Sequence, residues 1–279
     1  MYKNILAIYN RLFSFFDQLK FRIYEITKLR IERKNYNLFI SKKNPTIDII
    51  LPTYNRSQML KERSIPSVLK QTYKNFKLII IGDCCTDDTD KVIENFNDNR
   101  IFFKNLEKRK KRYPPTIENH WFAGPVVPIN EGLKYINADW ICRIDDDDIW
   151  TDDHLEILLK HVLETKSEFV SSSYISYINE KKVLKNFEDE KPAIGGVQTW
   201  LYINYLKFFK ANINCWRRNW HKVNDADLQD RMHKAGVKMS YINKVTAIII
   251  PRPGDKIVGI KAYKEKENYY LKQYEFSND

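Results

Sequence analysis

Four consecutive carboxylates, Asp145 to Asp148, are the residues of this sequence whose type and spacing point most directly to chemistry. Neighbouring carboxylates repel one another and raise one another's pKa unless a cation or solvent relieves the repulsion. A divalent cation, Mg²⁺ or Mn²⁺, held by one or two of them and by diphosphate oxygens of a ligand would do so. The alternative is that the acids only place negative charge at the N-terminus of the following helix, where it interacts favourably with the helix dipole. Asp145 directly follows an apolar run, outside the first turn of that helix, so we favour the metal.

Two further polar clusters follow apolar runs in the same way. The segment Pro-Thr-Tyr-Asn-Arg at 52–56 follows residues 47–51, and Gly82-Asp83 follows residues 76–81. Open parallel α/β sheets bind ligands at the carboxyl ends of their strands, so the three clusters should converge on one edge. A hydroxyl, an aromatic ring and a carboxylate gathered there can hold a planar nucleobase by stacking and by accepting its N–H protons.

The segments that carry these clusters alternate between strand-like and helical patterns. Apolar runs predict strands at residues 47–51, 76–81, 100–104 and 140–144. Helical patterns cover residues 57–72, 86–96, 128–137 and 152–165. This alternation predicts an α/β fold with a mainly parallel sheet and helices on both faces. The pattern is less regular after residue 169, where residues 245–250 are strand-like and those after 261 form a charged, Tyr-rich tail.

The first 44 residues carry most of the positive charge. The net charge of the chain is +11, and ten Lys and Arg stand against three Asp and Glu in residues 1–44. Apolar residues recur there at alternating spacings of four and three, which places them on one face of a helix: Ile5, Tyr9, Leu12, Phe16, Leu19, Ile23 and Ile26. We expect no transmembrane segment and no cleaved signal peptide, because no apolar run approaches the roughly 20 residues that span a bilayer.

The periodicity of this basic amphipathic helix does not tell what covers its apolar face. The helix can lie in a membrane interface with its Lys and Arg near anionic lipid. It can equally pack on the body of the same protein or pair with a second copy. The four cysteines, two of them adjacent, favour reduced thiols in the cytosol over a disulfide framework.

Three other features have both a functional and a structural interpretation. The basic segment 104–112 can clamp donor phosphates or an acceptor's pyrophosphate, or be a solvated charge run. The aromatic residues of 200–220 can form a platform for sugar rings or lipid, although aromatic residues at this density usually form core. The histidines show no metal-ligand spacing, and His154 and His161 are expected on the surface of one helix.

Four segments, in their order and spacing, carry a resemblance to a known family. They are IDIILPTYNR (47–56), LIIIGDCCTDDT (78–89), NEGLKYINADWICRIDDDDIW (130–150) and NDADLQDRMHKAG (224–236). Together they resemble the family 2 glycosyltransferases of GT-A fold, over residues 47 to 250. The resemblance implies a Rossmann-like, mainly parallel sheet flanked by helices, with the N-terminal amphipathic helix as an extension outside it.

The resemblance also implies roles for individual residues. Nucleotide contacts are implied, or expected from the same segments, for Pro52, Thr53, Tyr54, Asn55, Arg56, Asp83, Asp145 and Asp146. Asp145 and Asp147 match the positions that bind the metal, Mn²⁺ or Mg²⁺. Asp225 matches the general base, although Asn224 stands where the family usually has Glu. The alternative for Asp225 is a solvated acid at the start of a helix, since Asn224 and Asp225 also suit helix caps.

These residue types suit the expected reaction. Breaking a sugar–phosphate bond builds charge on the leaving diphosphate, which a cation at Asp145 and Asp147 stabilises. On the opposite face of the sugar, Asp225 would take the proton of the attacking acceptor hydroxyl, which gives a single displacement with inversion. We therefore expect an inverting, metal-dependent glycosyltransferase that uses a nucleotide diphosphate sugar, with UDP preferred.

The extents of the amphipathic helix and of the family resemblance divide the chain into three parts. Residues 1–44 are the basic helical extension, residues 45–260 the GT-A domain, and residues 261–279 a tail. Within the domain, residues 45–150 are the nucleotide-binding half and residues 151–260 the acceptor half. The expected acceptor is a saccharide or lipid-linked saccharide of a surface polysaccharide pathway. We expect the protein in the cytoplasm, peripheral at the inner face of the cell membrane through residues 1–40, with the N-terminal helix also able to mediate an oligomer.

Two rival functions remain at this stage. The positive charge fits a non-enzymatic protein that binds nucleic acid or lipid, but four carboxylates in the expected cleft would repel phosphate without a metal, so we expect no nucleic-acid partner. A nucleotidyltransferase would share the parallel sheet. The segment after the first strand lacks the glycines that let backbone approach a triphosphate.

Overall fold

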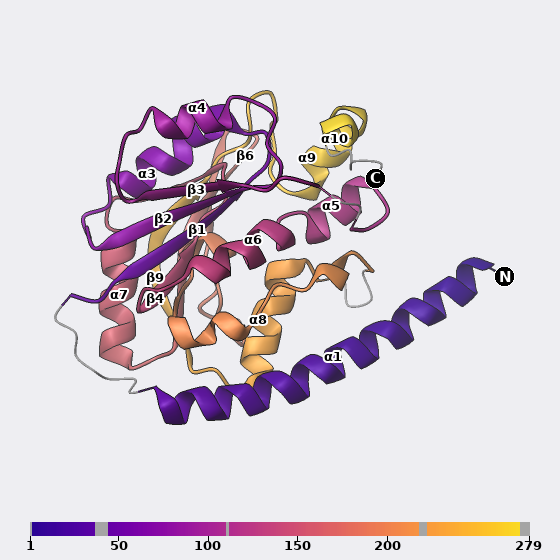
Figure 1. Ribbon diagram of the computed structural model, residues 1–279, viewed down its shortest axis with the longest axis horizontal. Helices are drawn as coiled ribbons and strands as arrows, with labels where there is room; N and C mark the ends of the chain where they lie inside the picture. Colours follow the sequence, from indigo (N-terminus) through magenta and orange to yellow (C-terminus); the bar gives the residue numbers. More distant parts are fainter. Residues whose placement is uncertain (1, 37–43, 110–111, 218–221, 274–279) are drawn as a thin grey trace.

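The computed structural model describes residues 2–36, 44–109, 112–217 and 222–273. Figure 1 shows a twisted sheet with helices on both sides and one long helix, α1 (Tyr2–Asn35), along an edge of the molecule. The strands of the described residues form one nine-stranded sheet in the order β3-β2-β1-β4-β8-β6-β9-β5, with β7 paired to β6.

The first half of the sheet is parallel and buried. It consists of β1 (Ile47–Thr53), β2 (Phe76–Gly82), β3 (Ile101–Asn105) and β4 (Trp140–Arg143). Ile47 of β1 is in register with Phe76 of β2 and with Trp140 of β4. Every residue of β1 is buried, as expected for a strand covered on both faces. The polar residues that follow β1, β2 and β4 therefore meet at one edge.

The second half of the sheet is mixed. It consists of β5 (Asp148–Trp150), β6 (Phe169–Ile178), β7 (Lys181–Lys185), β8 (Leu201–Ile203) and β9 (Met239–Ile249). β8 runs antiparallel to both β4 and β6, and β5 runs antiparallel to β9, whereas β6 and β9 are parallel. The predicted parallel arrangement thus describes the first half of the sheet, and strands of mixed direction extend the sheet beyond β4.

Most helices are short and connect the strands. The α-helices after α1 are α2 (Ser57–Met59), α3 (Ile65–Leu69), α4 (Thr89–Glu94), α5 (Ile117–Ala123), α6 (Val126–Gly132), α7 (His154–Thr165), α8 (Asn224–Ala235), α9 (Ile260–Glu265) and α10 (Glu267–Gln273). A π-helical turn, η1 (Leu60–Ser64), joins α2 to α3, and 3₁₀ turns are η2 (Leu133–Tyr135), η3 (Val197–Thr199), η4 (Asn204–Phe208) and η5 (Ile213–Arg217). α8 ends where Gly236 adopts a left-handed conformation with φ 90°, which favours glycine.

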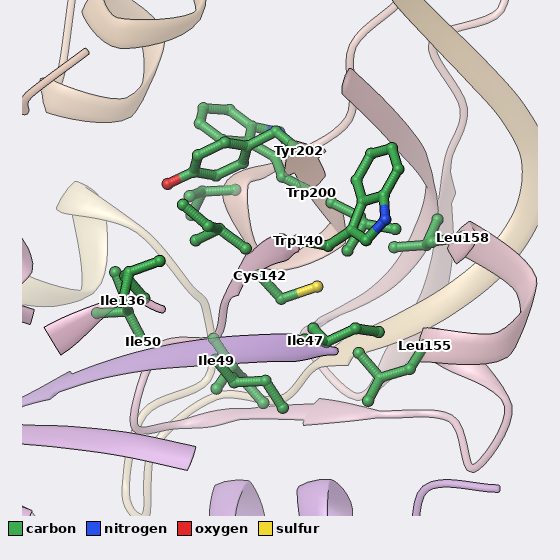
Figure 2. Packing of buried hydrophobic residues seen from close by; sticks show 14 of the residues in the cluster. Ile47, Ile49, Ile50, Ile136, Trp140, Cys142, Leu155, Leu158, Trp200 and Tyr202 are labelled. Atoms are coloured by element: carbon green, nitrogen blue, oxygen red, sulfur yellow. The ribbon is translucent and has the colours of Figure 1, made fainter. Parts of the chain in front are cut away.

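The main core lies between the sheet and the helices that cover it. Figure 2 shows side chains of β1 and β4 packed against α7 and against the segment around β8. Trp200 and Tyr202 are buried in this core, so this part of the aromatic segment is structural. Trp220 lies outside the described residues. Each fully buried aliphatic side chain contributes about 1.5–3 kcal/mol, so this layer fixes the strand ends that carry the polar clusters.

His154 is part of this core, contrary to the expectation of a surface position. It is fully buried and stacks on Trp150, with ring centroids 4.0 Å apart. Its Nδ1 lies 2.8 Å from Oγ1 of Thr246. The first turn of α7 faces the sheet, as the buried neighbour Leu155 shows, and helical periodicity alone did not reveal this orientation. Burial lowers the pKa of His154 to about 3.

Helix α1 (Tyr2–Asn35) packs on the body of the protein, but not through its apolar stripe. Leu29 and Glu25 are buried, and Arg33 donates from Nε and Nη2 to the carboxylate of Glu168, at 2.5 Å for each bond. Six of the seven residues of the predicted apolar stripe, from Ile5 to Ile23, are exposed, whereas the seventh, Ile26, is half-buried beside α8. No helix among the described residues is long and apolar enough to cross a membrane.

Replacing His154 with Phe should reduce the decrease in the free energy of unfolding at acidic pH. The neutral imidazole is required in the fold, so its contribution is complete above its unfolded pKa, near 6.5, and is lost as pH falls toward 3. Through this residue, the free energy of unfolding of the wild type should be about 1.4 kcal/mol lower at about pH 5.5 than at about pH 7.5. Thr246 keeps its bond to Ser172 in the variant. Thermal unfolding across this pH range measures the effect, and parallel pH curves for the two proteins would contradict it.

Candidate active site

A cavity of about 450 Å³ opens at the carboxyl ends of β1, β2 and β4. The three polar clusters and the start of α8 contribute to its wall. Of the predicted site residues, those that line it are Pro52, Thr53, Tyr54, Arg56, Asp83, Asp145, Asp146, Asp147 and Asp225. The structure therefore brings the acidic run and the predicted base to one cavity.

The acidic run is surrounded by arginines from separate elements. Arg143 donates to Oδ1 of Asp145 from Nε at 3.2 Å and from Nη2 at 2.8 Å. Asp147 Oδ2 lies 3.6 Å from Nη1 of Arg56 and 3.8 Å from Nε of Arg252, both longer than a hydrogen bond. These cations partly compensate the carboxylates, whose close spacing would otherwise be unfavourable.

The other two carboxylates of the run are more deeply enclosed. Asp146 Oδ2 accepts a hydrogen bond of 2.9 Å from Thr53 Oγ1, which links the end of β1 to the acidic run. Asp148 is buried at the start of β5. Burial, followed by the neighbouring carboxylates, raises the pKa of Asp148 well above its usual range. Asp148 therefore favours its protonated form, whereas Asp145 and Asp147 are less enclosed and offer their carboxylate oxygens to the cavity.

The donor set suits Mg²⁺ or Mn²⁺ only if a ligand completes it. No group of three His, Cys, Asp or Glu in the described part of the chain could hold a metal by itself. Asp145 and Asp147 offer carboxylate oxygens to the same cavity, and the separations at Asp147 exceed hydrogen-bond length. Mg²⁺ is typically bound by one or two carboxylates together with substrate phosphates and water. Oxygen ligands of this kind also suit Mn²⁺, so the residues fit a cation shared with a diphosphate.

Asp225 stands in the first turn of α8 and faces the same cavity. Burial raises its pKa, while the nearby guanidinium of Arg143 acts in the opposite direction. The backbone N–H of Ala226 donates to Oδ1 of Asp225 at 2.8 Å, which orients the carboxylate. A carboxylate with a raised pKa is a stronger base than an ordinary one and so suits proton abstraction.

Asn224, which stands where the family usually has Glu, makes two hydrogen bonds. Its Oδ1 accepts from Arg143 Nη1 at 3.4 Å, and its Nδ2 donates to the carbonyl of Phe122 at 3.3 Å. A carboxylate could accept from Arg143 but could not donate to a carbonyl. The amide therefore links β4, α5 and α8 and holds the start of α8 against the acidic run.

The predicted nucleobase residues are covered by the basic segment. Arg112 donates to both oxygens of Asp83, at 2.8 and 2.6 Å, and Arg109 Nε donates to Oδ2 at 3.0 Å. The guanidinium of Arg109 also stacks over the ring of Tyr54, 4.1 Å from its centroid. Part of the segment thus contacts the residues predicted to bind the nucleobase, instead of being only a solvated charge run. Residues 110–111 lie outside the described residues. A base bound by Asp83 must share this carboxylate with the arginines or displace them.

Asn55 is not among the residues that line the cavity. Its Oδ1 accepts from the backbone N–H of Thr86 at 2.8 Å, and its backbone adopts a left-handed conformation with φ 50°. It therefore connects the loop after β1 to the loop after β2, and positions Tyr54.

Several residues that line the cavity escaped the sequence reasoning. Arg143 lies within an apolar strand, and Arg252 follows β9, far from the acidic run in sequence. Nη1 of Arg252 is buried and has no hydrogen-bond partner among the described residues. Tyr263 of α9 stacks on Arg252 at 4.0 Å and also lines the cavity, so residues assigned to a tail contribute to the site. A charged residue in a buried strand was the signal available for Arg143.

Curated relatives resemble about half of this chain. The protein WcaA of Escherichia coli (strain K12), whose name assigns it to colanic acid biosynthesis as a glycosyl transferase, is 33% identical over 141 residues, 50% of this chain and 44% of its own. The Escherichia coli protein WfgD, named UDP-Glc:alpha-D-GlcNAc-diphosphoundecaprenol beta-1,3-glucosyltransferase, is 30% identical over 141 residues, 50% of each chain. The chain thus spans about half the length of the curated relatives it matches.

Solved structures support the fold. The TarS 1–349 structure from S. aureus in complex with UDP-GlcNAc superposes with a TM-score of 0.59 at 18% identity, over 76% of this chain and 60% of that one. The mannosyltransferase PcManGT from Pyrobaculum calidifontis, in complex with GDP-Man and Mn²⁺, gives 0.54 at 14% identity, over 90% and 69%. The predicted α/β GT-A fold is confirmed. The model of glycosyl transferase family 2 matches residues 48–225, well over half of the sequence, and the chain therefore belongs to that family.

Proposed function

We propose that the protein is an inverting, metal-dependent glycosyltransferase that transfers a sugar from a nucleotide diphosphate sugar to an acceptor hydroxyl. The observation that carries this proposal is that the acidic run after β4 and Asp225 of α8 line one cavity. A cation-binding carboxylate pair and a separate base are the two functions that the reaction requires. Family membership supports the reaction class.

The nucleoside is proposed to bind at the ends of β1 and β2. Tyr54 offers a ring for stacking, and Asp83 a carboxylate that can accept the N–H of a base. UDP is the preferred nucleotide, supported by the UDP-GlcNAc complex of TarS and by the UDP-Glc in the name of WfgD. Arg109 and Arg112 pair with Asp83 and so orient its carboxylate toward the cavity.

The diphosphate is proposed to lie between the acidic run and the arginines. Asp145 and Asp147 would hold Mn²⁺ or Mg²⁺, and Asp146 would support them through Thr53. The cation, when bound, neutralises charge that develops on the leaving diphosphate. Arg56 and the buried Nη1 of Arg252 would donate to phosphate oxygens directly, since a guanidinium is suited to phosphate geometry.

Asp225 is proposed as the general base. It would accept the proton of the acceptor hydroxyl as the oxygen attacks the anomeric carbon, on the face opposite the diphosphate. Arg143 contacts both Asp145 and Asn224. It would therefore hold the segment that binds the metal and the segment that carries the base at a fixed distance from each other. The acceptor would enter from the side of α8, which makes residues 151–260 the acceptor half and residues 45–150 the nucleotide-binding half.

The acceptor is proposed to be a lipid-linked saccharide of a surface polysaccharide pathway. The diphosphoundecaprenol in the name of WfgD supports a lipid-linked acceptor, and colanic acid in the name associated with WcaA supports a polysaccharide. An acceptor of this kind places the enzyme at the cytoplasmic face of the membrane, where nucleotide sugars are available.

Calorimetric titration with UDP, GDP and dTDP, with and without Mn²⁺, should show the tightest binding for UDP in the presence of Mn²⁺. Removing the carboxylate in Asp147→Ala should weaken this binding at least about tenfold, because the shared cation loses a ligand. Asp152→Ala is the matched control, since Asp152 is exposed and does not line the cavity. UDP binding that ignores Mn²⁺, or that survives Asp147→Ala unchanged, would exclude the proposed diphosphate site.

Replacing Asp225 with Asn should lower kcat/KM for transfer by about 10²- to 10⁴-fold and leave UDP affinity unchanged, because only the base is lost. The wild-type rate should rise with pH through the raised pKa of Asp225, since the base acts when deprotonated. This acidic limb should be absent from the residual rate of the variant. Asp230→Asn on the same helix is the control, because Asp230 pairs with Lys222 and Lys234 outside the cavity. An active Asp225→Asn enzyme would exclude this residue as the base.

A further inference from the structure

Helix α1 presents two faces of opposite character. The inner face contacts α8 and the 3₁₀ turns η4 and η5 through polar residues, through Leu29 and through the rings of Phe13 and Phe21. The outer face carries an apolar stripe whose residues are 42–63% exposed: Ile5, Tyr9, Leu12, Phe16, Leu19 and Ile23. Figure 1 shows α1 along the lower edge of the molecule with α8 on its inner side. Water-exposed apolar side chains in such a row are unusual on a monomer and indicate an interaction surface.

The acidic and basic residues of α1 also differ in where they lie. Its three acids are all engaged: Asp17 accepts from Asn212 and Asn214, Glu25 pairs with Arg231, and Glu32 pairs with Lys28. The exposed charged residues of α1 are exclusively basic in the described part of the helix: Arg11, Lys20, Arg22, Arg30 and Lys34. The exposed surface of α1 therefore combines apolar and cationic side chains, without acids.

We propose that this outer face of α1 docks on an anionic lipid bilayer. The helix lies in the plane of the interface, with the stripe among the acyl chains and the basic residues at lipid phosphates. At 1.5 Å per residue the helix offers a line of contact of roughly 50 Å. A second copy fits this face less well, because two outer faces would bring like charges together with no exposed acid to pair with them.

The docking face is connected to the proposed base through one buried network. Gln18 Nε2 donates to Oδ1 of Asp227 at 2.7 Å, and Arg231 Nε donates to Oδ2 of the same residue at 2.8 Å. Arg231 also pairs with Glu25. Asp227 lies two residues after Asp225, so a bilayer that holds α1 also holds the element that carries the base. The proposal rests in this respect on the proposed function, since a lipid-linked acceptor would arrive along the same surface.

Co-sedimentation of the full chain with vesicles tests the proposal. The wild type should bind phosphatidylcholine vesicles that contain about one third phosphatidylglycerol, bind pure phosphatidylcholine weakly, and dissociate as salt screens the attraction. The variant Leu12→Gln/Phe16→Gln/Ile23→Gln should bind at least about tenfold more weakly, because three inserted side chains are lost. These residues are exposed, so circular dichroism should show an unchanged fold.

A matched control removes three apolar side chains of similar exposure elsewhere. Leu163→Gln/Leu184→Gln/Tyr269→Gln should bind vesicles like the wild type, because these residues lie on α7, β7 and α10. Equal loss in both variants would show that general surface apolarity, not α1, drives binding, and would overturn the proposal. Wild-type protein that does not bind anionic vesicles would also overturn it.

The same proteins distinguish the competing occupant and the proposed function. A different outcome is a wild-type dimer that the α1 substitutions convert to a monomer, with no vesicle binding by either protein. In that outcome a second copy of the chain covers the stripe, and the proposal fails. UDP binding with Mn²⁺ is measured in parallel and should be equal in wild type and α1 variant. Loss of vesicle binding with retained UDP binding is the expected pattern for the α1 variant. Vesicle binding by a wild type that does not bind UDP would leave the docking face intact and contradict the proposed function.

Discussion

The structure depends on the balance between four successive carboxylates after β4 and the arginines that face them. Arg143, Arg56 and Arg252 come from different parts of the chain and surround Asp145 and Asp147. Buried or crowded carboxylates are costly unless such cations are close. The compensation is incomplete at Asp147, where both separations exceed hydrogen-bond length. This incomplete compensation is what supports the proposed cation, shared with a diphosphate, at Asp147.

The parallel half of the sheet brings these charges together. β1 pairs with β2 on one side and β4 on the other, in register over their apolar residues, so three polar segments end at the same level. The fourth component, α8, is added from the other side of the cavity. Arg143 links it to the acidic run through Asn224, and the network of Asp227, Arg231 and Glu25 links it to α1. Burial raises the pKa of Glu25 to about 7, opposed by Arg231, which shows how deeply this network is enclosed.

The parts of the fold that could be predicted are those with strong local patterns. The runs at 47–51, 76–81 and 140–144 are apolar except for one charged residue each, and they form β1, β2 and β4 with the clusters at their ends. Strand direction beyond β4 was not predictable, because the pattern of β6 and β8 does not encode a pairing partner. His154 was misplaced because helical periodicity does not say which turn meets the sheet.

The acidic residues of the candidate site could be placed together from the sequence, and its arginines less so. Asp83, Asp147 and Asp225 follow strands or begin a helix, which are positions that sequence reveals. The partners of Asp83, Arg109 and Arg112, lie in a charge run whose neighbours depend on tertiary structure. For α1 the spacing revealed an apolar stripe but not its direction. The inner face combines apolar contacts with polar residues that pair with Asp227, Arg231 and Glu168.

The most direct test of this account is a crystal structure of the protein with UDP and Mn²⁺, with data collected at the manganese absorption edge. The account predicts one anomalous peak in the cavity, at bonding distance from the diphosphate and from a carboxylate oxygen of Asp145 or Asp147, with the uracil near Tyr54 and Asp83. Asp225 should lie across the cavity from the diphosphate, with space for a sugar between them. Manganese bound elsewhere, or UDP bound with its diphosphate away from the acidic run, would contradict the account.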